Sequence, residues 1–165
     1  MNFDDWVKTV PDTITSDRLW SVTAYRLALF SSTIGWHDVS RLIKDARTVS
    51  LADQLYRSLG SIHANYAEGY SYSTGGNRAR YFEYALGSAR ESRDWYYDAR
   101  FVLGDDVMNH RLALLARIIQ LLTVTIPDQR KSTLRESKPE YVVEANNNES
   151  DLLRLLTNVP ILSDS

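Results

Sequence analysis

The chain has 165 residues, a formal net charge of −2 and no cysteine, which excludes disulfides, thiolate metal sites and cysteine nucleophiles. Its composition, 44% hydrophobic and 24% charged, is typical of one soluble globular domain. The acidic start, Met1–Trp6, lacks the basic and apolar parts of a signal peptide, and no apolar run reaches the length of a membrane span. We therefore expect a cytoplasmic protein without membrane contact.

Charge is unevenly distributed along the chain. Residues 17–131 carry a net charge of +3, whereas residues 1–16 and 132–165 are both acidic. A mildly basic body with acidic ends keeps nucleic-acid binding open as a hypothesis but does not establish it.

Apolar side chains recur every three to four residues in four stretches, which predicts helices over 17–45, 51–70, 77–103 and 106–126. Ser16 or Asp17 is a candidate N-cap of the first helix, and Gly35 interrupts that helix with either a kink or a close contact. Gly104 and Pro127 are expected to end the third and fourth helices. No strand pattern is convincing.

Four helices with short connections predict an all-α fold, an antiparallel up-down four-helix bundle over residues 17–127. An N-terminal extension, 1–16, precedes it. A polar C-terminal tail, 128–165, follows, with a linker over 128–150 and a short helix near 151–157. Both ends carry small apolar faces, for which docking on the bundle is favoured over docking on a partner.

Polar side chains form one stripe on each of the two middle helices, beside the apolar face. Because buried polar groups must be paired, we predict that the stripes meet in a structural network that holds these helices in register. Gly87 and the small residues near it would permit close approach. The predicted network comprises Ser61, Asn65, Glu68, Tyr84, Ser88 and Glu91.

A carboxylate pair, Glu68 and Glu91, is also compatible with metal binding or acid–base catalysis. Di-iron bundles, however, require a Glu three residues before a His, on two helices. Ile34, Gly60 and Val107 occupy that position before the three histidines, so none fits. We expect no catalytic residues, no metal and no cofactor.

Arginines crowd the third helix, interleaved with aromatic and acidic residues. Arginine with aromatic side chains suits both single-stranded nucleic acid and protein interfaces. A solvated or subunit-contact face is favoured over nucleic acid, and both remain open. The residues concerned are Arg78, Arg80, Arg90, Arg93, Arg100 and Tyr97.

A pair of motifs, Asn-x-Ala-Glu-Gly at 65–69 and Ala-Leu-Gly-Ser-x-x-Glu at 85–91, carries a family resemblance, supported by Leu19-Trp20 and Gln54-Leu55-Tyr56-Arg57. The chain resembles the small bacterial four-helix-bundle proteins encoded in intervening sequences of 23S ribosomal RNA genes. The resemblance covers about residues 17–126.

This resemblance implies a non-enzymatic protein that forms a homopentamer and acts as an accessory or scaffold. A related branch serves diversity-generating retroelements, where a basic pentamer assists a reverse transcriptase and contacts its RNA. The alternative it implies is therefore a nucleic-acid-binding accessory protein. The present chain is not strongly basic and has longer, acidic ends than that branch.

Overall fold

The computed structural model describes residues 2–131 and 149–161, and within these ranges every regular element is helical. The long helices are α3 (Thr23–Leu42), α4 (Val49–Tyr70), α5 (Gly75–Leu103) and α6 (Asp105–Lys131). The short elements are α1 (Phe3–Val7), α2 (Asp12–Thr15), the 3₁₀ helix η1 (Arg18–Ser21) and α7 (Glu149–Thr157).

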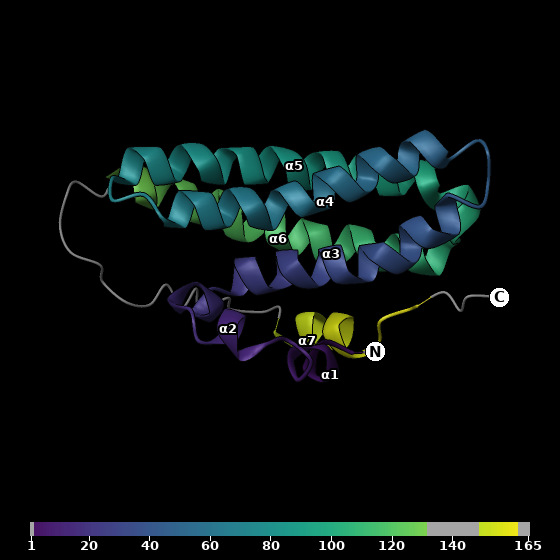
Figure 1. The fold of residues 1–165 in the computed structure, drawn as a ribbon, viewed down its shortest axis with the longest axis horizontal. Helices are drawn as coiled ribbons and strands as arrows, with labels where there is room; N and C mark the ends of the chain where they lie inside the picture. Colours follow the sequence, from purple (N-terminus) through teal and green to yellow (C-terminus); the bar gives the residue numbers. More distant parts are fainter. Residues whose placement is uncertain (1, 132–148, 162–165) are drawn as a thin grey trace.

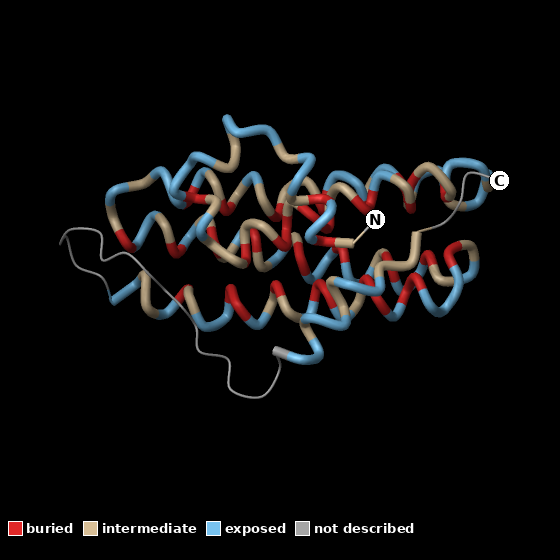
Figure 2. Tube along the Cα trace, turned by 90° about the horizontal axis from the view of Figure 1, so that it is seen from below, coloured by how far each residue is buried: buried red, intermediate tan, exposed pale blue. Residues whose placement is uncertain are grey.

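Helices α3 to α6, here called the helical core, lie side by side, with the short helices along the α3 side (Figure 1). Each packs against the next in sequence, and α3 also contacts α6. Buried residues line the inward sides of these helices (Figure 2). Full burial of each Leu, Ile or Phe side chain stabilises the fold by roughly 1.5–3 kcal/mol. Fully buried examples are Leu27, Ile34, Leu55, Leu59, Ile62, Phe82, Leu114 and Ile118.

The first predicted helix is divided in the structure. Asp17 caps η1, since its Oδ1 accepts a hydrogen bond from the backbone N–H of Leu19 at 2.8 Å. Val22 then has extended backbone angles, so α3 begins only at Thr23. At the other end, the carbonyl of Leu42 accepts from the Thr48 hydroxyl at 2.6 Å and from the backbone N–H of Asp45 at 3.2 Å.

The prediction that Pro127 ends the fourth helix is wrong, because α6 continues through it to Lys131. A proline inside a helix removes the bond to the carbonyl four residues earlier, here that of Thr123. Thr123 and Pro127 are both exposed, so water can replace the lost donor.

Gly35 makes a close contact between helices. A Cβ at this position would lie 2.5 Å from Cδ1 of Leu59, so any larger residue would displace the buried Leu59 side chain where α3 packs against α4. Gly69 makes a similar close contact between α4 and α5, since a Cβ added there would lie 2.9 Å from the Phe82 ring. Gly87 has no such role, because a Cβ added there would meet nothing within 4 Å. Our expectation for Gly87 was therefore wrong.

Both terminal segments dock on the helical core. Phe3 and Trp6 of α1 are buried, and the Trp6 ring lies 5.1 Å from the ring of Phe30. Helix α7 includes the short helix expected near 151–157, and it contacts α1 and α6. Residues 132–148, which make up most of the predicted linker, lie outside the described residues.

Candidate functional site

The predicted polar network is not formed as a buried cluster. Glu68, Tyr84 and Glu91 are exposed, and the other three residues are only half-buried. Asn65 Nδ2 donates to the Ser61 carbonyl at 2.8 Å, and the Ser88 hydroxyl donates to the Tyr84 carbonyl at 3.0 Å. Both bonds stay within one helix, as does the bond from Trp95 Nε1 to Glu91. These three bonds therefore do not connect α4 with α5.

A different pair links the two helices. The hydroxyl of Ser92 donates to the hydroxyl of Ser58 at 2.8 Å, and both serines are buried. Ser92 occupies a position in α5 where the surrounding repeat is apolar or aromatic. Ser92 is buried because it lies on the inward face of α5 with these residues. The predicted polar stripes lie at the edges of the buried faces of α4 and α5, next to solvent.

A tyrosine cluster occupies the junction of α4 and α5. Tyr72 and Tyr81 stack with ring centroids 5.0 Å apart, and the Tyr72 hydroxyl donates to that of Tyr81 at 3.2 Å. Hydrogen bonds with Tyr72 and then with Glu68 raise the pKa of Tyr81, so Glu68 does interact across the helix pair. Arg80 Nε donates to the exposed Tyr84 hydroxyl at 2.8 Å.

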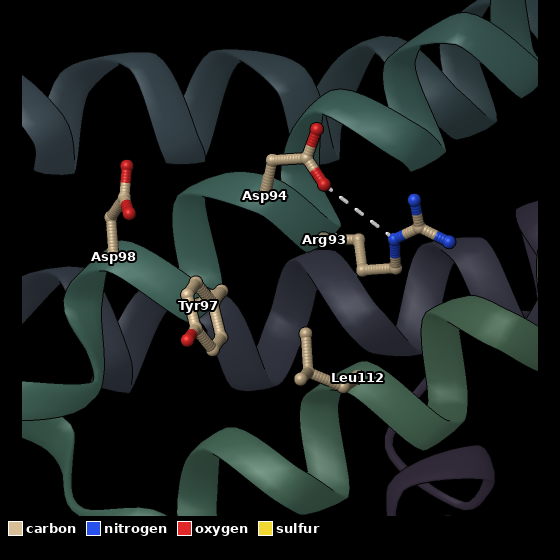
Figure 3. Close-up of a pocket in the computed structure, with 5 residues that line it drawn as sticks. All are labelled: Arg93, Asp94, Tyr97, Asp98 and Leu112. Carbon is tan, nitrogen blue, oxygen red and sulfur yellow. Dashed lines mark ion pairs between the residues drawn. The ribbon is translucent and has the colours of Figure 1, made fainter.

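A second arginine–aromatic group lies toward the other end of α5. The Arg100 guanidinium carbon lies 4.0 Å from the ring centroid of Tyr97 and 4.1 Å from that of Phe101. Tyr97 is 52% exposed and Phe101 83% exposed, so this surface is open to a partner. Tyr97 also borders a shallow hollow of about 260 Å³ between α5 and α6, with Arg93 and Leu112 (Figure 3).

The six predicted contact residues thus fall into separate groups. Arg80 and Arg93 differ by roughly 140° around the helix axis, and Arg80 and Arg100 by about 30 Å along it. Arg78 joins the first group, where its Nη2 donates to the Ser73 carbonyl at 3.4 Å. Arg90 is exposed between the groups. One continuous arginine surface is not formed.

The most buried polar site was missed by sequence reasoning. Arg111 of α6 pairs with Asp38 of α3 through two bonds, Nε to Oδ2 at 2.7 Å and Nη2 to Oδ1 at 3.0 Å. These side chains are 1% and 0% exposed. The Tyr96 hydroxyl of α5 also donates to Asp38 Oδ2, at 2.7 Å. Three helices are therefore joined by one carboxylate.

His110 extends this site toward the C-terminal segment. Its Nδ1 lies 2.8 Å from Arg111 Nη1, and its Nε2 lies 2.7 Å from the Leu155 carbonyl. Arg111 Nη2 also donates to the Pro160 carbonyl at 2.8 Å. The buried site thus holds α7 and the residues after it as well as the helical core.

A sequence signal for this site exists. Asp38 follows Leu27, Ser31 and Ile34 on the inward stripe of α3, and Arg111 precedes Leu114 and Ile118 on that of α6. Opposite charges on the apolar stripes of two helices predict a buried ion pair, because neither charge is stable there alone.

Metal ligands do not gather in the described part of the chain, where no group of three His, Asp or Glu side chains is placed to hold an ion. His63 is half-buried, and burial lowers its pKa. What the geometry offers is exposed contact surface on α5 and a buried structural site.

Comparisons with known proteins identify one family. Residues 30–124, more than half of the chain, match the family model described as 23S rRNA-intervening sequence protein. Searches of curated proteins and of solved structures gave no significant match. Asp38, Tyr96 and Arg111 lie inside the matched segment, whereas α1 and α7 lie outside it.

Proposed function

The chain belongs to the 23S rRNA-intervening sequence protein family, and we propose that it is a non-enzymatic accessory or scaffold protein that assembles with copies of itself. The assembly is a homopentamer, in keeping with the family resemblance. The observation that carries the proposal is the exposed Tyr97–Arg100–Phe101 surface of α5. Aromatic and arginine side chains are enriched at protein interfaces.

Each protomer in this proposal is an antiparallel up-down four-helix bundle. Its support is the contact pattern, in which α3, α4, α5 and α6 pack in sequence order and α6 returns to α3. The connections between these helices are short, which favours antiparallel neighbours.

A pair of single substitutions tests the contact surface. Phe101→Asp places a charge in the proposed interface and should reduce the molar mass measured by light scattering after gel filtration. Because Phe101 is 83% exposed, the far-UV circular dichroism spectrum should not change. The matched control is Val49→Asp, a charge at another exposed apolar residue, which should leave the mass unchanged. An unchanged mass for Phe101→Asp would remove this surface from the proposal.

The second candidate function is that of a nucleic-acid-binding accessory protein, for example a partner of a reverse transcriptase. It is favoured by the cluster of Tyr72, Tyr81 and Tyr84 beside Arg78 and Arg80. Stacked aromatic rings next to arginine suit the bases and phosphates of a single strand.

Gel-shift titrations with single-stranded RNA and DNA at several salt concentrations test this candidate. Arg80→Gln should weaken binding and flatten its salt dependence, since each lost phosphate contact lowers the slope. Arg57→Gln removes an exposed arginine from α4 and should change neither. Absence of binding at low salt would exclude the candidate.

We also propose a cytoplasmic location. Helix α6 is long and apolar enough, by length and composition alone, to cross a membrane. Its Leu114, Leu115, Ile118 and Leu122 are instead buried in the core, which supports the role of a core helix. Its Arg111 is also paired with Asp38 within the protein.

A further inference from the structure

Trp36 is exposed on a helix that is otherwise covered. The structure describes every residue of α3, Thr23–Leu42, and Trp36 alone among them is exposed, at 58%. Its ring centroid lies 5.7 Å from that of Tyr56, so the indole lies on the side of the protomer where α3 meets α4. Tryptophan is one of the residue types that contribute most to binding at protein interfaces. Trp36 is therefore a candidate anchor for a partner.

The hollow between α5 and α6 has the chemistry to hold an indole (Figure 3). Its volume of about 260 Å³ is smaller than the roughly 300–1,000 Å³ of pockets for small-molecule ligands. Tyr97 and Leu112 give it apolar walls, and the Arg93 guanidinium is a cation that favours the face of a tryptophan ring. Asp94 and Asp98 supply acceptors for the indole N–H, which can only donate.

Trp36 and this hollow lie at the same level along the helical core. Asp38 of the buried site bonds to one side chain of α5 and one of α6. Trp36 precedes Asp38 by two residues, which is roughly 3 Å along the helix axis. Tyr97 and Leu112 directly follow the two partners of Asp38 in sequence. Two copies with parallel axes can therefore join Trp36 to the hollow with almost no shift along the core.

Ring symmetry makes this shared level important. Isologous contacts join copies in pairs, so a ring of five copies needs a heterologous contact between two different surfaces of each protomer. Heterologous contacts that also shift each copy along the rotation axis build a filament instead of a closed ring. Trp36 and the α5–α6 hollow are two different surfaces without such a shift.

We propose, on the basis of the self-assembly proposed above, that Trp36 of each copy docks in the α5–α6 hollow of the next copy. The indole lies against Tyr97 and Leu112, with the Arg93 guanidinium over its face. Its Nε1–H donates to a carboxylate at the rim of the hollow. The exposed surface of α5 is thus one half of the interface, and the Trp36 side of α3 is the other half.

Complementation between two variants tests this contact. Trp36→Asp removes the anchor and keeps the hollow, whereas Tyr97→Asp alters the hollow and keeps the anchor. Each variant alone should show the 18.9 kDa mass of one chain in sedimentation equilibrium. An equimolar mixture should form a dimer of twice that mass, because one intact contact remains. Both residues are exposed, so the far-UV circular dichroism spectra should match that of the unchanged protein.

Val124→Asp is the matched control, because it places a charge at another exposed apolar residue, roughly 18 Å along α6 from Leu112. It should keep the mass of the unchanged protein. The proposed contact is overturned if Trp36→Asp or Tyr97→Asp keeps the mass of the unchanged assembly, or if their mixture shows only single chains. A mass of one chain for the unchanged protein would instead overturn the proposed self-assembly, and this contact with it.

Discussion

At the scale of single residues, Asp38 and Arg111 form a fully buried ion pair, whose charges are both removed from water. Their attraction offsets the cost of removing two charges from water, and the hydroxyl of Tyr96 and the carbonyl of Pro160 complete their hydrogen bonds. Such a pair contributes little beyond what apolar residues of equal volume would contribute. Loss of one partner is costly, because the other charge stays buried.

Asp38→Ala should therefore lower the free energy of unfolding by about 3–5 kcal/mol, as measured by urea denaturation. Asp38→Leu combined with Arg111→Met should restore much of this loss, since no charge is left unpaired. Tyr96→Phe removes one bond and should cost about 1 kcal/mol.

Glu68→Ala is the control for the Asp38 variants, because its carboxylate is exposed. It should change the free energy of unfolding by less than about 0.5 kcal/mol. If Glu68→Ala and Asp38→Ala were equally damaging, the assignment of the buried site would be contradicted.

Sequence reasoning located apolar residues better than polar ones. The apolar periodicity that predicts a helix over 51–70 includes Leu55, Leu59 and Ile62, and all three are fully buried. The stripe with Glu68 was assigned to the interior because it adjoins the apolar face. On a helix, a buried position and a position at the edge of the buried face differ by only some tens of degrees around the helix axis. Hydrophobic periodicity does not distinguish two positions that lie so close together.

At the scale of elements, two helical glycines have opposite surroundings. Gly35→Ala should destabilise the protein by about 1–3 kcal/mol, because its Cβ would lie 2.5 Å from Leu59 and the core would have to shift. Gly87→Ala meets nothing within 4 Å and should stabilise by up to about 1 kcal/mol through helix propensity.

Thermal melting of the two glycine variants beside the unchanged protein measures both effects. Destabilisation by Gly87→Ala, or tolerance of Gly35→Ala, would contradict the packing of α3 against α4 described above.

Predicted and observed elements agree best where packing and propensity act together. The helices expected over 51–70 and 77–103 are found as Val49–Tyr70 and Gly75–Leu103. The first helix was predicted too long, because the extended backbone at Val22 leaves the apolar pattern intact. Helix α6 was predicted too short, because a proline was expected to end it. Pro127 is exposed, so water can replace the hydrogen bond that the helix loses there. That exposure depends on the tertiary structure and cannot be read from the sequence.

At the scale of the whole molecule, stability should depend on pH through His63 and His110. Burial lowers the pKa of both in the folded chain. The unfolded chain gains these protons near pH 6.5, while the folded chain gains them only at lower pH. Between those values the unfolded chain binds more protons, so the free energy of unfolding falls as pH falls.

Melting temperatures measured at about pH 7.5 and about pH 5.5 should show this fall, and the double variant His63→Gln, His110→Gln should show a smaller one. If the melting temperature of the double variant fell as much as that of the unchanged protein, groups other than these two histidines would control the pH dependence.

Sedimentation equilibrium of the unchanged protein measures the proposed self-association. Five copies of an 18.9 kDa chain predict a mass of about 95 kDa that stays constant over a range of protein concentrations. A mass of 18.9 kDa throughout that range would contradict the claim.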